Sequence, residues 1–298
     1  MQDMPTWKDF PRYPVVAGTA ALAVGITVAW WLKADVSVVF CTAEIRRGQL
    51  WRLLTCVFPH TDFLHLIFNL YWLWVFGTLI ERVYGHARTF LLFVLLGVGS
   101  NAFEFALARG GVGLSGIGYG LFGLLWMLSR HDDRFRDHMD QRTVNIFIGW
   151  FFFCIITTIA HIMPVANVAH GAGALLGILT GIAVTSPRWR LLVSTGLAVL
   201  VALGLWAATY GRPLVNLSHY GGYEEGRWGY DALLANHNQE AVRWLRDATR
   251  MQPQTPQYWF NLGIAYHRLG NIPAAKAAYQ RAHQLKPNDP AYNSPYDN

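Results

Sequence analysis

Residues 113–120 read GLSGIGYG and place a single serine, Ser115, between glycines at the start of an apolar segment. Glycine neighbours allow another backbone to approach the serine closely and permit an unusual turn. Tyr119 lies four residues later, on the same face of a helix that contains both residues. Ile117 replaces the second glycine of the G-x-S-x-G hydrolase elbow, so this is a different motif. We interpret Ser115 as a candidate nucleophile.

The composition of the chain places it in the membrane class. Of 298 residues, 53% are hydrophobic and only 14% are charged, which is too apolar for an ordinary soluble protein. The formal net charge of +6 comes from small basic groups between apolar runs, without a continuous basic stripe. We therefore expect no nucleic-acid partner, and we interpret the basic groups as signals of membrane orientation.

The three cysteines give little functional information. Cys41, Cys56 and Cys154 are scattered and lack the spacing of metal ligands. Cys41 and Cys56 could pair if their loop faces an oxidising compartment, but we expect unpaired thiols. The sequence indicates no metal and no organic cofactor.

Apolar runs succeed one another along most of the chain. They cover about residues 15–32, 63–80, 89–108, 115–129, 144–163, 168–186 and 191–210. Each is near the roughly 20 residues that a spanning helix needs, so we predict seven transmembrane helices. The first run lacks a small-residue cleavage site, which favours a helix over a signal peptide. Residues 33–60 are too polar to span and are predicted to form an interfacial, partly helical loop.

Basic residues indicate the orientation of these helices. If the N-terminus is inside, the inner segments carry Lys8, Arg12, Arg82, Arg88, Arg130, Arg134, Arg136, Arg142, Arg188 and Arg190. The outer loops then carry only Lys33, Arg46, Arg47, Arg52 and Arg109. Since basic residues favour the cytoplasmic side, we expect a cytoplasmic N-terminus. An odd number of spans puts everything after Tyr210 on the outer side, which is the periplasm if this is a bacterial inner-membrane protein.

The region after Tyr210 is polar and repetitive. Trp259, Leu262, Gly263, Tyr266, Gly270, Ala275, Tyr279, Ala282 and Pro287 match the tetratricopeptide pattern. A weaker copy precedes it, which predicts two helix-pair repeats at about 222–255 and 256–289. A pair this short is expected to dock on something, since about three repeats usually make a stable stack. We divide the chain into an N-terminal segment 1–13, a membrane domain 14–210 and a repeat domain 211–298.

Several polar residues inside the spans share one depth. Ser115, His65 and His170 lie 15, 16 and 16 residues from the inner ends of their runs. At about 1.5 Å per residue this is roughly 22–24 Å, against a hydrocarbon core of about 30 Å. Asn69 lies four residues after His65 and shares its helix face. Polar groups at this depth are costly, so they indicate a functional site.

These residue types support acyl-transfer chemistry. A serine hydroxyl needs an adjacent base, and a neutral imidazole is the usual one, so either His170 or His65 could act on Ser115. Asn69, the other histidine and the backbone N–H of Ser115 could stabilise an oxyanion. Glu104 lies at a different level, so we expect no carboxylate as a third member.

One set of motifs occurs in a fixed order along residues 14–186. It consists of Trp51-Arg52, His65-x-x-x-Asn69, Glu81 with Gly85, Gly113-Leu114-Ser115-Gly116 with Tyr119, and Asn167-x-x-His170 followed by Gly173-x-x-x-Gly177. In this order the motifs resemble the rhomboid family of intramembrane serine proteases. The seventh span and the repeat pair lie outside the six-helix core of that family.

The resemblance implies a role for each motif residue. Ser115 would be the nucleophile and His170 its general base, which leaves His65 and Asn69 as oxyanion donors. Tyr119 would pack its ring on His170. The supporting glycines would be Gly113 and Gly116 beside the serine, with Gly173 and Gly177 allowing the sixth span to approach the fourth.

Other polar and aromatic residues have simpler interpretations. We interpret His60 and His161 as structural or loop residues, and Asn101 and Glu104 as interhelical hydrogen-bonding groups. Trp51-Arg52 is interpreted as an interface anchor with a snorkelling guanidinium. Trp150 and the phenylalanines at 151–153 are interpreted as lipid-facing bulk, although the resemblance also implies a substrate gate at this span.

The sequence thus predicts an all-α membrane protein with a six-helix rhomboid core, a seventh transmembrane helix and a small tetratricopeptide-like repeat domain. We expect an intramembrane serine endopeptidase with a Ser-His dyad that acts in the lipid bilayer on transmembrane protein substrates, with a protein partner for the repeats. The alternative is a catalytically inactive rhomboid-like scaffold or assembly factor whose repeats bind membrane clients.

Overall fold

The computed structural model describes residues 6–218 and 221–296, and within them the chain is helical, with no strand. It forms two compact units, Met1–Thr209 and Tyr210–Asn298, which are described separately. Short 3-10 turns and the helix α2 (Arg52–Thr55) fill the loop between the first two long helices. The all-α membrane fold predicted from the sequence is confirmed.

Within residues 6–209, the first unit contains seven long helices. These are α1 (Pro14–Trp31), α3 (Phe63–Tyr84), α4 (His86–Leu107), α5 (Ser115–His131), α6 (Gln141–Ile159), α7 (Asn167–Thr185) and α8 (Arg190–Thr209). Among the described residues, all but α5 are long and apolar enough to cross a membrane by themselves. Helix α5 is the shortest, with 17 residues, and its contact with α7 is the most extensive between any two helices.

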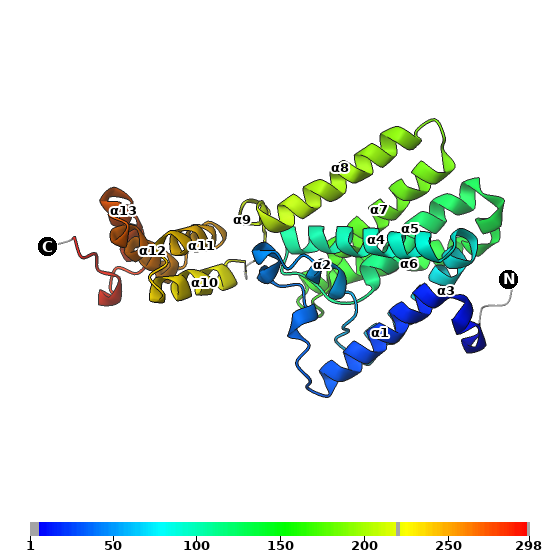
Figure 1. Cartoon of the computed structure of the whole chain (residues 1–298), viewed down its shortest axis with the longest axis horizontal. Helices are drawn as coiled ribbons and strands as arrows, with labels where there is room; N and C mark the ends of the chain where they lie inside the picture. The colour runs from blue at the N-terminus through cyan, green and yellow to red at the C-terminus, as the bar shows by residue number, and fades with distance from the viewer. Residues whose placement is uncertain (1–5, 219–220, 297–298) are drawn as a thin grey trace. The chain divides into compact units, whose positions relative to one another are not determined.

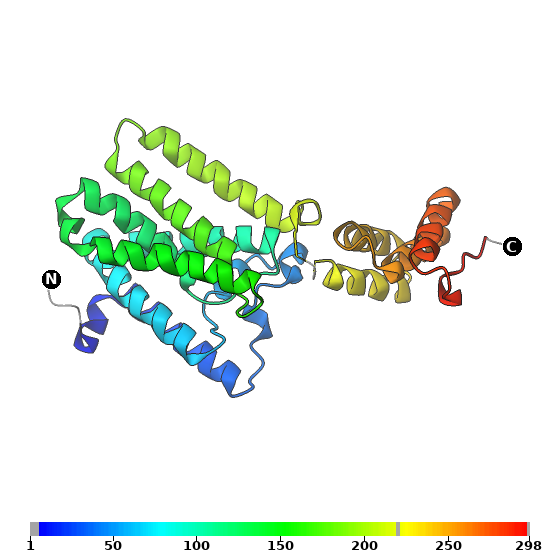
Figure 2. The ribbon, with the colours of Figure 1, turned by 180° about the vertical axis from the view of Figure 1, so that it is seen from behind.

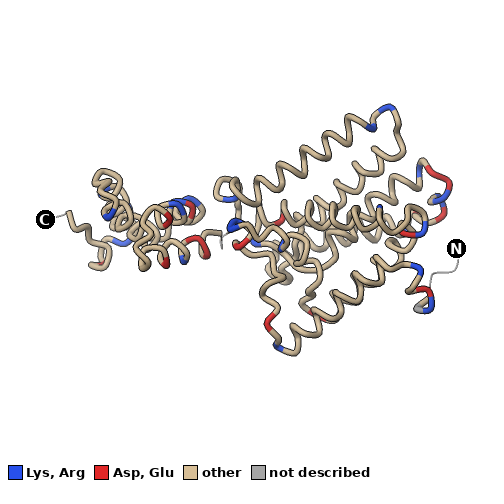
Figure 3. Tube along the Cα trace, viewed as in Figure 1, with Lys and Arg blue, Asp and Glu red and all other residues tan. Residues whose placement is uncertain are grey.

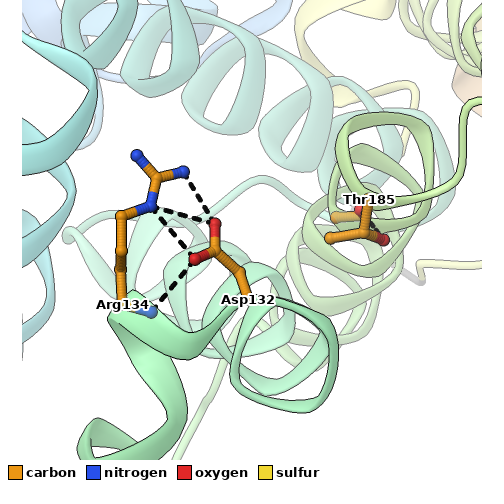
Figure 4. Close-up of polar contacts among 4 residues, drawn as sticks. Asp132, Arg134 and Thr185 are labelled. Atoms are coloured by element: carbon orange, nitrogen blue, oxygen red, sulfur yellow. Dashed lines mark hydrogen bonds and ion pairs between the residues drawn. The ribbon is translucent and has the colours of Figure 1, made fainter.

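Charge placement in this unit fits a membrane-embedded bundle. The charged residues gather in the loops and at helix ends, and the helices between them carry few charges (Figure 3). In the loop after α5, Arg134 donates to both carboxylate oxygens of Asp132, at 2.7 Å to Oδ2 and 3.0 Å to Oδ1 (Figure 4). These bonds hold the pKa of Asp132 below its usual range. The same view shows Thr185 near the end of α7, whose hydroxyl donates to the carbonyl of Gly181 (2.8 Å).

Close backbone contact joins α5 and α7. A Cβ atom on Gly173 would overlap the carbonyl oxygen of Gly116, and one on Gly177 would overlap that of Gly120. Small residues allow membrane helices to approach this closely, so packing and weak backbone contacts replace the hydrophobic effect. The register of α5 against α7 is therefore set by contacts between backbone atoms. Backbone atoms cannot move aside as a side chain can, so the register is fixed.

Helix α8 covers one side of this bundle. It lies against α4 and α7 and runs beside α7 in both views (Figures 1 and 2). Gly204 faces Phe103 of α4, where an added Cβ would be 3.0 Å from the ring. At the C-terminal end of α8, Arg46 from the first loop donates to the carbonyl of Thr209 (2.9 Å). A cation at this end also complements the helix dipole.

The second unit consists of short helices. It contains α9 (Arg212–Val215), α10 (Tyr223–Leu234), α11 (Asn238–Met251), α12 (Pro256–Arg268) and α13 (Ile272–Leu285). Each predicted repeat holds one contacting helix pair, α10 with α11 and α12 with α13. Gly229 packs on Leu245 and Gly263 on Tyr279 at equivalent places in the two pairs. A buried ion pair between Arg212 and Glu225 (3.2 Å) joins α9 to α10.

Candidate active site

The loop before α5 places Ser115 at the first position of a helix. Gly113 has φ +106°, a conformation that side-chain-bearing residues rarely adopt, and its N–H donates to the carbonyl of Cys56 (3.1 Å). The next N–H, of Leu114, donates to Nε2 of His60 (3.3 Å). Two successive N–H groups of this turn are therefore held by the first loop. The backbone N–H of Ser115 lies at a helix N-terminus, where N–H groups have no intrahelical partner.

Ser115 and His170 are in direct contact. Nε2 of His170 lies 2.9 Å from Oγ of Ser115, within hydrogen-bond distance. His170 is in the first turn of α7 and is 4% exposed, while Ser115 is partly buried. The glycine contacts between α5 and α7 come within the next turns of both helices. They fix the distance between the two backbones that carry the pair.

Tyr119 packs on the histidine ring. The two rings are stacked, with centroids 4.6 Å apart and planes inclined by 25°. The Tyr119 hydroxyl donates to the carbonyl of Phe147 on α6 (3.1 Å), which fixes the ring at its far end. Nδ1 of His170 is buried and has no hydrogen-bond partner within residues 6–218 and 221–296. The arrangement is thus a Ser-His pair supported by an aromatic ring, without a carboxylate on the imidazole.

The two candidate oxyanion donors lie differently. The ring of His65 packs against Gly113, where an added Cβ would be 2.7 Å from Cε1 and Nε2 of the imidazole. His65 is therefore beside the serine turn, with its Nδ1 3.2 Å from the hydroxyl of Thr61. Asn69 is buried, but its amide donates to the carbonyl of His65 in its own helix (2.9 Å). The structure brings His65 to the turn and leaves the Asn69 amide paired within α3.

His60 has a contact that the sequence did not indicate. It is fully buried, and its Nδ1 contacts the carbonyl of Phe58 (2.9 Å) and the hydroxyl of Thr27 on α1 (3.4 Å). Burial, together with the neighbouring His65, lowers the pKa of His60 to about 4. A neutral imidazole can accept from Leu114, so His60 holds the backbone beside Ser115. Its position before the start of α3 carries no periodic signal that could have predicted this contact.

Two buried polar residues of α4 behave differently from each other. Glu104 accepts a hydrogen bond at Oε2 from the N–H of Ala169 in α7 (3.0 Å), so it is interhelical as the sequence predicted. The amide of Asn101 instead donates to Gly97 one turn earlier in its own helix (2.9 Å). The interhelical prediction for Asn101 is wrong, because a side-chain amide inside a helix can satisfy itself on the preceding turn.

Arg52 does not snorkel to an interface as the sequence suggested. Its side chain is buried and donates to the carbonyls of Ser37 (2.7 Å) and Phe40 (3.1 Å) and to the side chain of Gln49 (2.7 Å). Unpaired loop carbonyls are costly when buried, and a guanidinium can bind several at once. Arg52 therefore holds the first loop together, while the neighbouring Trp51 is half exposed.

Aromatic side chains line the contact between α3 and α6. Phe68 and Trp150 have ring centroids 5.2 Å apart, and Trp72 meets Phe147 at 4.8 Å. Trp150, Phe152 and Phe153 are exposed, as expected of lipid-facing bulk, and Phe151 instead turns towards Tyr119. Cys56 and Cys154 are free thiols, and the described residues contain no cluster of side chains that could hold a metal ion.

Comparison with known proteins identifies two matching regions in this chain. Residues 47–187 match the model of the rhomboid domain, and residues 227–290 match a tetratricopeptide repeat. The chain is 28% identical over 179 residues to rhomboid protease GlpG of Serratia proteamaculans (strain 568) and 27% over 177 residues to that of Yersinia pestis (strain Pestoides F). Each alignment covers 56% of this chain and 61% of the relative, so the chain spans about three fifths of the length of the curated relatives.

Proposed function

We propose that this chain, an integral membrane protein with a rhomboid domain followed by tetratricopeptide repeats, is an intramembrane serine endopeptidase. The observation that carries the proposal is the 2.9 Å contact between Oγ of Ser115 and Nε2 of His170. A nucleophile and its base within hydrogen-bond reach, beside backbone donors at a helix N-terminus, are the parts that acyl transfer needs.

The first half of the reaction forms an acyl-enzyme. Ser115 Oγ attacks the carbonyl carbon of the scissile peptide bond while its proton passes to Nε2 of His170. The tetrahedral intermediate then collapses, the C–N bond breaks, and the imidazolium donates the same proton to the departing amine. In the second half, water gives a proton to His170 and attacks the ester. The imidazolium then returns that proton to Ser115 Oγ as the C–O bond breaks, and the product leaves as a carboxylic acid that ionises in water.

The negative charge of the intermediate would be stabilised by preorganised donors. The N–H groups at the start of α5, including that of Ser115, point out of a helix N-terminus, where the dipole favours negative charge. His65 lies against the same turn and could donate from its ring. Asn69 would first have to rotate its amide away from the His65 carbonyl. We therefore assign the backbone and His65 the larger share and Asn69 a smaller one.

The substrates would be membrane proteins whose transmembrane segments expose a peptide bond near the outer surface. A helix hides its peptide bonds in internal hydrogen bonds, so segments with small or helix-breaking residues should be cleaved best. Water would enter from the outer face. With the N-terminus in the cytoplasm of a bacterium, the repeats would lie on the periplasmic side and recruit substrates or an adaptor.

A reporter cleavage assay tests the proposal. A reporter membrane protein with a destabilised transmembrane segment is incubated with the parent protein, with Ser115→Ala and, as a control, with Ser129→Ala. Ser129 is on the same helix, and its hydroxyl donates to Trp126 of that helix (3.1 Å). We expect cleavage by the parent and by Ser129→Ala and none by Ser115→Ala. Equal product from parent and Ser115→Ala would contradict the proposal and favour an inactive scaffold.

A further inference from the structure

Helix α7, which carries His170, begins without a cap of its own. Its N-cap residue is Ala166, whose side chain cannot accept a hydrogen bond. The first N–H groups of a helix have no intrahelical partner, and leaving them unpaired in a buried setting costs free energy. The start of α7 is buried at Ala169 and His170, so these donors need an acceptor from elsewhere.

Glu104 of α4 supplies that acceptor. Its Oε2 receives the N–H of Ala169 at 3.0 Å, and the N–H of Val168 also faces this carboxylate. Glu104 is 4% exposed and Ala169 is 3% exposed, so water contributes little there. A negative group at a helix N-terminus also interacts favourably with the helix dipole. The carboxylate therefore acts as a cap that one helix provides for another.

The cap lies next to the proposed base. Ala169 directly precedes His170, whose own N–H makes an early bond of α7, to the carbonyl of Ala166 (3.2 Å). The segment after α4 is also packed against this point, because a Cβ on Gly111 would lie 2.6 Å from the Cβ of Ala166. The N-terminal half of α7 is thus held on the α4 side by Glu104 and on the α5 side by the glycine contacts.

We propose that Glu104 is a positioning residue that keeps His170 at hydrogen-bond distance from Ser115. The carboxylate acts on the backbone that carries the imidazole, and the imidazole itself has no carboxylate partner on Nδ1 among the described residues. Misplacement of a reacting group by about 1 Å can cost roughly a hundredfold in rate. This inference rests on the proposed function of the Ser115–His170 pair.

Three substitutions separate position from charge. Glu104→Gln keeps the length of the side chain and one carbonyl oxygen that can accept from Ala169. Glu104→Asp keeps the charge but is one methylene shorter, so it does not reach the same N–H. Glu104→Ala removes both the acceptor oxygen and the charge. Asn101→Ala is the matched control, because Asn101 is a buried polar residue of the same helix whose amide donates to Gly97 one turn earlier.

The readouts are kcat and KM on the reporter substrate, the rate of fluorophosphonate labelling, and amide hydrogen exchange at Val168 and Ala169. We expect Glu104→Ala to lower kcat by about 10- to 100-fold, with KM changed by less than about twofold and labelling slowed in parallel. Exchange at the two amides should become faster. Glu104→Gln should recover most of the rate and Glu104→Asp little, while Asn101→Ala should stay within about twofold of the parent.

Each outcome decides between defined alternatives. If Glu104→Ala keeps the parent kcat and labelling rate, or if Glu104→Asp restores the rate better than Glu104→Gln, the positioning role is wrong although the proposed protease function stands. If Glu104→Ala fails to fold, the kcat values of Glu104→Gln and Glu104→Asp still show whether side-chain length or charge matters more. If the parent itself neither cleaves nor labels, the proposed function fails, and amide exchange in Glu104→Asp as slow as in the parent would then also contradict the cap.

Discussion

Helices α1 and α7 both begin at a buried glutamate that belongs to another helix. At α1, the carboxylate of Glu81 on α3 accepts from the N–H groups of Val15 and Val16, both at 2.9 Å. At α7, Glu104 of α4 accepts from Ala169 at 3.0 Å. The two contacts are physically the same, since each satisfies orphan donors at the positive end of a helix dipole.

The two helices differ in the residues that come directly after the cap. The start of α1 carries none of the proposed site residues, whereas the start of α7 carries His170 one residue after the capped N–H. Glu81 also has a second partner, with its Oε1 2.7 Å from Nδ1 of His86. One kind of electrostatic contact would therefore serve stability at one helix and the proposed catalytic geometry at another, according to the side chain that the capped turn carries.

The largest expected loss of stability and activity comes from those glycines of α7 that pack against another backbone, as the glycines Gly18 and Gly25 of α1 do not. Gly177→Ala places a methyl group on the carbonyl of Gly120, and backbone atoms cannot move aside cheaply. We expect it to destabilise the protein by about 3 kcal/mol and to abolish cleavage. Gly25→Ala in α1 is the control, because nothing lies within 4 Å of the added Cβ. It should be neutral or slightly stabilising in thermal unfolding. Equal losses of stability in Gly177→Ala and Gly25→Ala would mean that α7 is not packed more closely than α1.

Low pH should destabilise the protein through His60, which holds the backbone beside Ser115. Burial lowers its pKa from 6.5 to about 4, so between these values the unfolded chain binds a proton that the folded chain does not. The free energy of unfolding should therefore be highest above pH 6.5. It should fall by up to about 3 kcal/mol as the pH drops towards 4. Unfolding followed from pH 7 to 4 measures this, with His60→Asn as the comparison. An identical pH profile in His60→Asn would contradict the role of His60.

A smaller effect should separate the two glutamates. Glu81→Ala removes the cap of α1 and is expected to cost about 1–3 kcal/mol of stability, because two buried N–H groups lose their acceptor. Its kcat per folded molecule should remain within about twofold of the parent, unlike that of Glu104→Ala. Thermal unfolding and cleavage measured on the same samples test this. A kcat loss in Glu81→Ala as large as that in Glu104→Ala would erase the distinction between the two caps.

The fold was largely predictable from the sequence, and the site only in part. Apolar runs predicted the long helices, because membrane helices satisfy their own backbone and show their length in composition. Counting residues along the spans placed Ser115, His65 and His170 at one depth. Depth alone does not show in which direction around its helix each side chain points. The resemblance to the rhomboid family implies that His170 is the base, and the structure shows that His170 meets Ser115 while His65 packs on Gly113.

The sequence predicts an interhelical hydrogen bond for Glu104, but it does not identify the distant backbone N–H that a side chain contacts. Glu104 and His60 act on backbone groups 65 and 54 residues away, and backbone groups carry no sequence signal. The sequence suggests an interface anchor at Arg52 for the same reason, since the partners of Arg52 are loop carbonyls.

The most direct test is to locate a fluorophosphonate adduct by mass spectrometry in the parent protein and in His170→Ala. We predict a single adduct on Ser115 in the parent, formed at least about a hundredfold more slowly in His170→Ala because the hydroxyl loses its base. An adduct on another serine, or equal labelling of Ser115 in both proteins, would contradict the Ser115–His170 dyad.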